Sequence, residues 1–318
     1  MSEYEFRYGD QLLECVPYYK YLGVILDEHL KFERCVQTLA DSGGRALGSI
    51  INKFKTLKNV GYRTFECMYN SGVKPILEYC CSVWGHVKGS SIDCIQNRAM
   101  RYYLGVHKMS PNLALNGDMG WLTPKLSRYK CKLRFWNRLM EMDENRITKQ
   151  IFHWDFQYCK KNWSSDMLDV FTRLDSDAFI CKEIYNLDTI DSKLKDLMLV
   201  EWKNEVVKKP KLRTYCLFKE NVDTEDYVAK LNQRYERSLF SQFRHGILPL
   251  KIETGRFQKL SVEERRCEYC TDNVIEDEMH FICTCSLYTE FRTKLFNRAQ
   301  ESNPLFNGLS VKEKSFKM

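Results

Sequence analysis

Apolar residues recur at helical spacing along most of the chain, with polar residues at the positions between them. Stripes of this kind predict amphipathic helices, so we expect a mainly α-helical fold. In the first stripe Gly43 and Gly44 interrupt the pattern, which indicates either a close helix crossing or a kink. The predicted helices cover about residues 29–54, 63–71, 75–85, 90–103, 123–142, 164–176, 189–208 and 224–244.

Near the N-terminus the pattern changes to strict alternation, which is typical of strands. Tyr4, Phe6 and Tyr8 alternate with polar residues, and Gly9–Asp10 is a turn signal. These features predict a small β-hairpin from strands at 3–8 and 11–16. The aromatic and β-branched segment 18–26 is predicted as one further strand.

The clearest predicted helix, 123–142, has Thr123 at its N-cap and Pro124 at its first position. Its apolar stripe consists of Leu126, Tyr129, Leu133, Trp136 and Met140. A basic face lies opposite this stripe and consists of Lys130, Arg134 and Arg138. That face is either solvated or in contact with phosphates.

A second basic run follows the predicted break at Pro210. Its members are Lys208, Lys209, Lys211, Arg213 and Lys219. Tyr215 and Phe218 lie among them. Aromatic residues among basic ones suit stacking on unpaired bases, but the same two positions also fit the core side of a helix.

Composition adds a weak charge signal to this picture. The 318 residues are 44% hydrophobic and 29% charged, which is typical of globular chains with two or three domains. The net charge of +7 is compatible with a single-stranded RNA or DNA partner. No signal region or apolar run near the ~20 residues of a membrane span is present, so we expect an intracellular protein, nuclear or cytoplasmic, with no membrane partner.

The strongest chemical signal is a Cys-x2-Cys-x9-His-x4-Cys cluster formed by Cys267, Cys270, His280 and Cys285. In a reducing compartment such spacing predicts a tetrahedral Zn²⁺ site rather than disulfides. If residues 280–285 are helical, Cys283 shares a face with His280 and is the alternative fourth ligand. Two aromatic residues flank the ligands and can stack on bases, namely Tyr269 and Phe281.

Motifs of common enzyme classes are absent from the sequence. It contains no aromatic-x-Asp-Asp pair, no Gly-x-x-x-x-Gly-Lys-[Ser/Thr] loop and no Gly-x-Ser-x-Gly elbow. The close carboxylates Asp175/Asp177 and Glu276/Glu278 lack the partners of a catalytic pair. We therefore expect no catalysis by this chain alone, and no small-molecule substrate.

Several segments resemble the C-terminal part of a non-LTR (LINE-type, jockey-like) retrotransposon reverse transcriptase. Residues 18–32 (YYKYLGVILDEHLKF) and 74–85 (KPILEYCCSVWG) are similar to its end of the palm and its thumb. Residues 120–139 are similar to a segment after the thumb, and residues 265–292 to its Cys-Cys-His-Cys knuckle. The family spacing of the knuckle favours Cys285 over Cys283.

The resemblance implies a division of the chain into six parts. These are a palm remnant (1–27), a thumb-like helical bundle (28–120), a helical connector (121–210), a helical segment (211–260), a zinc knuckle (261–298) and a flexible tail (299–318). The family's catalytic aspartates would lie before residue 1, so an upstream polymerase core would have to come from another chain. The implied function is template, primer or target handling, and the alternative is a zinc-stabilised protein–protein interaction module.

Overall fold

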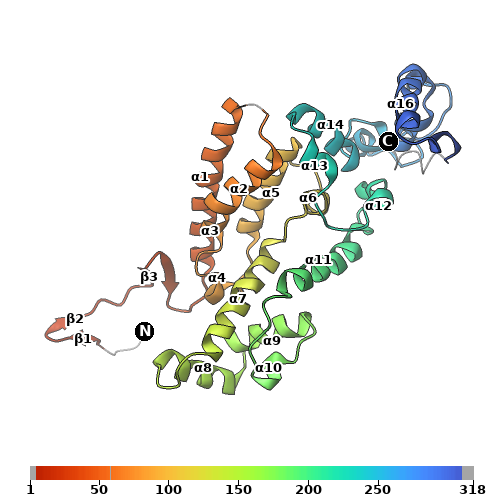
Figure 1. Cartoon of the computed structure of the whole chain (residues 1–318). Coiled ribbons are helices and arrows are strands. Elements are labelled where there is room, and N and C mark those ends of the chain that lie inside the picture. The colour runs from red at the N-terminus through yellow and green to blue at the C-terminus, as the bar shows by residue number, and fades with distance from the viewer. Residues whose placement is uncertain (1–4, 58, 310–318) are drawn as a thin grey trace. The chain divides into compact units, whose positions relative to one another are not determined.

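The computed structural model describes residues 5–57 and 59–309. Helices make up 61% and strands 5% of it, so the predicted mainly α-helical fold is confirmed (Figure 1). The chain forms two compact units. Unit 1 consists of the chain up to Asn52, Cys67–Gln96 and Thr123–Lys193, and unit 2 consists of Lys53–Glu66, Asn97–Leu122 and the chain from Leu194. These units do not follow the predicted boundaries, because several helices contain residues of both.

Two separate hairpins begin the chain in unit 1. The first pairs β1 (Arg7–Tyr8) with β2 (Gln11–Leu12) across the turn expected at Gly9–Asp10. The second pairs β3 (Tyr18–Tyr21) with β4 (Val24–Asp27). The prediction of one strand over 18–26 is therefore wrong. Leu22 and Gly23 adopt positive φ angles of 45° and 88°, and these reverse the chain.

The first long helix, α1 (Glu33–Leu57), continues through its glycine pair. A Cβ atom on Gly43 would lie 2.4 Å from Leu77 Cδ2, so the glycine marks a close crossing and not a kink. Helices α2 (Tyr62–Gly72) and α5 (Ser90–Leu104) lie where predicted. The helix predicted over 75–85 is instead α3 (Lys74–Leu77) and α4 (Cys81–Trp84), because Cys80 between them has a left-handed φ of 54°.

An aromatic core surrounds helix α7 (Pro124–Met140) in unit 1. Thr123 caps this helix as predicted, with its hydroxyl oxygen accepting a hydrogen bond from Leu126 N. Trp136 on the buried face contacts rings of three further helices at centroid distances of 5.1–5.6 Å. Those rings are Phe152 on α8 (Ile147–Tyr158), Phe171 on α9 (Trp163–Arg173) and Phe179 on α10 (Ala178–Cys181). Helix α8 was not predicted.

The remaining α-helices belong to unit 2, apart from residues 190–193 at the start of one of them, which belong to unit 1. They are α6 (Asn112–Met119), α11 (Ile190–Val206), α12 (Tyr215–Phe218), α13 (Asp226–Lys230), α14 (Arg234–Arg244), α15 (Lys251–Phe257) and α16 (Thr289–Ser302). The single helix predicted over 224–244 is thus two helices. Within the described ranges, no helix is both long and apolar enough to cross a membrane.

The described part of the expected flexible tail, residues 299–309, is folded. Residues up to Ser302 belong to α16, and the buried ring of Phe306 packs on Phe296 at a centroid distance of 5.3 Å. This contact folds the chain back on the helix. The rest of the expected tail, 310–318, lies outside the described residues.

Candidate metal centre and nucleic-acid interface

A short antiparallel bridge presents the first two cysteines of the predicted metal cluster. Arg266 pairs with Ile275, and Cys267 N donates a hydrogen bond to Val274 O at 2.9 Å. The loop between these two arms contains Cys270. Asn273 has a positive φ of 55°, which lets the loop turn back to pair its second arm with the first. Two cysteines three positions apart therefore face the same point.

A widened helical turn supplies the other two ligands. Residues His280–Thr284 form a π-helical turn, and Cys285 N donates to His280 O at 2.8 Å. This geometry returns Cys285 toward the histidine. The ligand atoms of Cys267, Cys270, His280 and Cys285 all lie within 4.8 Å of one another. The predicted cluster is present, and Cys283 is not part of it.

The donor geometry fits a tetrahedral metal ion. With metal–sulfur and metal–nitrogen bonds of about 2.3 and 2.05 Å, a tetrahedral sulfur–nitrogen separation is about 3.5 Å. Cys270 Sγ lies 3.4 Å from His280 Nε2. The other ring nitrogen, Nδ1, is 3.0 Å from Thr284 Oγ1, a contact that fixes the ring orientation. Four protein donors form a closed shell, which is typical of structural metal centres.

We call the segment 261–298, which contains the cluster, the metal module. Two of its glutamates attach it to the rest of unit 2. Glu278 is only 1% exposed and accepts hydrogen bonds from Arg213 Nη2 at 2.7 and 2.9 Å and from Thr214 Oγ1 at 2.9 Å. The buried side chain of Glu276 accepts from Lys251 N at 2.7 Å. The sequence assigned no role to these carboxylates. Only one sequence feature could have indicated this role. Both glutamates are acidic residues in a loop, and the basic run at 208–219 offers cations that can pair with them.

The basic run is divided between surface and interior. Lys208 and Lys209 are exposed, although Lys208 pairs with Glu205 at 2.7 Å. Lys211 pairs with Glu253 at 3.4 Å, and Arg213 is bound by Glu278, so both charges are compensated within the fold. Lys219 is buried. Tyr215 is buried as well, so for this ring the core alternative holds and stacking on bases is wrong.

The basic face of α7 belongs to unit 1. Arg134 and Arg138 are exposed, whereas Lys130 Nζ bonds both carboxylate oxygens of Asp191, at 2.5 and 2.7 Å. Two of the three predicted cations are therefore open to an anionic partner.

The two aromatic residues predicted to stack on bases, both in the metal module, differ in solvent exposure. The side chain of Tyr269 is 64% exposed beside the ligand Cys270. Phe281 is half-buried and packs edge-on against Tyr288 at a centroid distance of 4.8 Å. Tyr269 can therefore stack on a base, while Phe281 belongs to the packing of the module.

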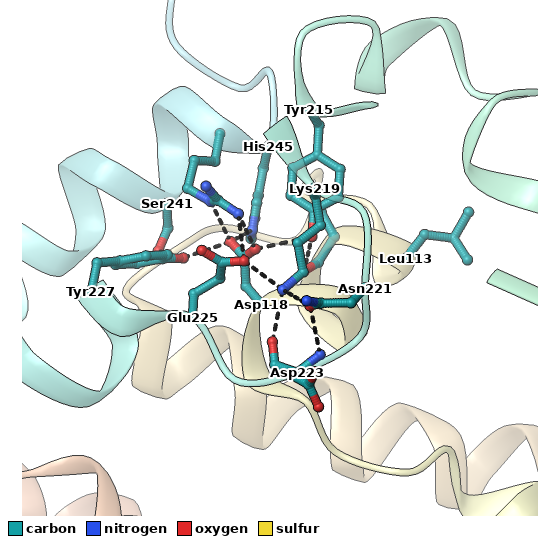
Figure 2. A network of polar contacts seen from close by, with 12 residues as sticks. Leu113, Asp118, Tyr215, Lys219, Asn221, Asp223, Glu225, Tyr227, Ser241 and His245 are labelled. Atoms are coloured by element: carbon teal, nitrogen blue, oxygen red, sulfur yellow. Dashed lines mark hydrogen bonds and ion pairs between the residues drawn. The ribbon is translucent and has the colours of Figure 1, made fainter. Parts of the chain in front are cut away.

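A buried polar network centred on Asp118 was not predicted (Figure 2). The Asp118 carboxylate is fully buried and accepts from Arg244 Nη2 at 2.8 Å. It also accepts from the hydroxyls of Tyr215 and Tyr227 at 2.9 and 2.7 Å. His245 Nε2 lies 3.0 Å from it. Partners more than 90 positions away in sequence are thereby fixed to one carboxylate of α6.

The charges of this network are mutually stabilised. Burial alone would raise the pKa of Asp118, but Arg244 and His245 outweigh burial and hold that pKa well below its usual value. Burial, together with the Asp118 charge, raises the pKa values of Tyr215 and Tyr227 well above normal, so both rings stay protonated as donors. The network is an ion pair with its hydrogen bonds satisfied.

The same network contains a serine, a histidine and an aspartate in contact. Ser110 Oγ lies 2.7 Å from His245 Nδ1, and His245 Nε2 contacts Asp118. In a serine hydrolase the imidazole is reversed, with Nε2 toward the serine, and the hydroxyl is accessible to substrate. Ser110 is only 2% exposed. The arrangement is therefore a structural cross-link and not a catalytic triad.

Comparison of the chain with family models, with curated proteins and with solved structures finds no match.

Proposed function

We propose that this chain is a nucleic-acid-binding protein with a structural Zn²⁺ at Cys267, Cys270, His280 and Cys285. The observation that carries the proposal is the convergence of these four donors within 4.8 Å. Three thiolates and an imidazole are soft to borderline donors, a set that suits zinc better than magnesium or calcium. A closed shell gives the ion a structural role.

The surface chemistry supports a nucleic-acid partner. Exposed cations remain at Arg134, Arg138, Lys208 and Lys209, and the net charge of +7 attracts phosphates. Tyr269 adds an exposed ring at the metal module. The similarity of residues 18–32, 74–85, 120–139 and 265–292 to a LINE-type reverse transcriptase supports the same class of partner. We propose template, primer or target handling for this chain, without polymerisation of its own.

A second candidate function is a zinc-stabilised protein-interaction module. One observation favours it. Helix α8 exposes an apolar stripe at helical spacing, formed by Ile147, Ile151, Trp154 and Tyr158. An exposed stripe of this kind is typical of a surface that another protein covers. Binding to single-stranded RNA or DNA distinguishes the two candidates.

The basic face of α7 gives a direct test. Replacing Arg134 and Arg138 by Gln is expected to flatten the plot of log affinity against log salt by roughly 1.4, because each lost phosphate contact on a single strand is worth ~0.7. Lys130 is left unchanged because Asp191 already neutralises it. The measurement is fluorescence anisotropy of a labelled single-stranded oligonucleotide over a salt series.

The matched control removes two charges that are already paired. In this variant Lys230 and Lys294, which pair with Asp226 and Glu290 four residues earlier, are both replaced by Gln. We expect the control to keep the parental slope. An Arg134/Arg138 variant whose slope equals that of the parent would mean that this face is only solvated.

A further inference from the structure

A pocket of about 480 Å³ lies within unit 2, apart from the metal module. Segments distant in sequence line it, including the end of α1, α2, the end of α5 and the start of α14. Its lining includes the aromatic residues Phe65, Tyr102 and Tyr235 and the polar residues Lys55, Gln233 and Arg234. Its size falls in the range of pockets that hold a small molecule or a single nucleotide.

The floor of the pocket is a fixed aromatic stack. Phe65 stacks on Tyr103 at a centroid distance of 4.9 Å and on Trp121 at 6.1 Å, with interplanar angles of 25° and 11°. The Arg237 guanidinium covers the ring of Tyr103 at 3.8 Å, and its Nε donates to Tyr103 O at 2.8 Å. These contacts hold the floor in place before any ligand arrives.

The mouth of the pocket carries exposed aromatic and cationic groups. Tyr235 is 72% exposed. The guanidinium of Arg234 lies 5.2 Å from the ring centroid of Tyr102, and its Nε donates to Tyr102 O at 3.3 Å. Lys55 and Gln233 are exposed at the same rim. Among the described lining residues there are three cations, Lys55, Arg234 and Arg237, and no carboxylate.

This combination selects an anionic ligand with a flat ring. An apolar peptide side chain would bury the aromatic surface but would bring no negative charge to Lys55 and Arg234, which face no carboxylate among the described lining residues. A nucleotide satisfies both parts, because its base stacks on aromatic rings and guanidinium planes while its phosphate meets a basic side chain. The Gln233 amide has both a donor and an acceptor for a base edge.

We propose that this pocket binds one nucleotide of a single-stranded nucleic acid, with the base against Tyr235 and the Tyr102–Arg234 face and the phosphate toward Lys55. The proposal rests on the proposed nucleic-acid function and names a site for it outside the metal module. A single strand is required because a base must leave its duplex to enter a pocket of this kind.

The test uses the full chain loaded with zinc and a single-stranded 12-mer that contains one 5-iodouracil, as RNA and as DNA. Irradiation is expected to cross-link the oligonucleotide to Tyr235 or Tyr102, located by peptide mapping. Tyr235→Ala should weaken binding roughly 10-fold, the effect of losing one stacking ring. Phe257→Ala is the matched control, because Phe257 is an equally exposed aromatic residue (76%) of unit 2 that does not line the pocket.

The outcomes separate the two proposals. If the parent binds the 12-mer but Tyr235→Ala and Phe257→Ala bind equally well, and no cross-link maps to the pocket, the pocket proposal is overturned while the proposed function stands. If the parent does not bind at low salt, the proposed function fails, and the pocket proposal fails with it.

Discussion

Replacing Cys270 by serine is expected to release the metal ion and to unfold residues from about 262 to 298, while the helical body stays folded. A serine hydroxyl is a poor zinc ligand, and a structural zinc site contributes an apparent binding free energy of about 10–16 kcal/mol. The module has little other core, because its regular segments are one bridge, a π-helical turn, a 3-10 turn at Ser286–Tyr288 and α16. Zinc content by mass spectrometry and hydrogen exchange of the module report the two effects.

Cys283→Ser is the matched control for this experiment. Cys283 lies in the same turn as His280 and is buried, yet it is outside the ligand cluster. The control should retain one zinc ion per chain. Full zinc content in Cys270→Ser, or loss of zinc in Cys283→Ser but not in Cys285→Ser, would contradict the ligand assignment.

Replacing Asp118 by asparagine is expected to lower the free energy of unfolding of unit 2 by about 3–5 kcal/mol. This is the usual cost of removing one partner of a buried ion pair, because the other charge stays buried and loses its nearest counter-charge. Here that charge is Arg244, which also lies within 3.3 Å of Glu225. Urea denaturation followed by hydrogen exchange in α6 and α14 measures the loss.

Asp226→Asn is the matched control, because Asp226 forms an exposed pair with Lys230 on neighbouring α13. Exposed pairs contribute little, so the change in unfolding free energy should stay within about 0.5 kcal/mol. A loss in Asp118→Asn no larger than in this control would show that the buried network is not a source of stability.

The pH dependence of the same variant has a defined sign. The folded-state pKa of Asp118 is lowered, so its carboxylate stabilises the fold fully above its unfolded-state pKa of about 3.9, and this stabilisation is lost as the pH falls from there toward the folded pKa. Asparagine has no such titration. The difference in unfolding free energy between parent and Asp118→Asn should therefore narrow as the pH falls below about 4.

Local signals predicted much of the helical fold. The cap Thr123–Pro124 placed the start of α7, and apolar periodicity located α1, α2, α5 and α11. Two of the errors lie at non-glycine residues with positive φ. Leu22 and Cys80 reverse or break elements that their sequences favour as continuous, and neither residue type signals a left-handed conformation.

The metal ligands were predictable because they lie within 19 consecutive residues, where spacing alone restricts geometry. The residues of the Asp118 network, in contrast, are far apart in the sequence. Asp118 and Arg244 are 126 positions apart, so only the tertiary fold brings them together. For the same reason, local patterns could not predict the two glutamates that anchor the metal module or the pocket lined by residues of four helices.

We propose that this chain binds single-stranded nucleic acid and that a zinc-stabilised module contributes to the affinity. The most direct test is an anisotropy titration of a labelled 12-mer at low salt with the zinc-loaded chain, with the chain after chelation, and after one equivalent of Zn²⁺ is restored. We expect binding by the loaded chain, a loss of affinity of roughly tenfold on chelation, as expected when the module that presents the stacking ring of Tyr269 unfolds, and recovery with zinc. No binding by the loaded chain, or the same affinity with and without the metal, would contradict the proposed function.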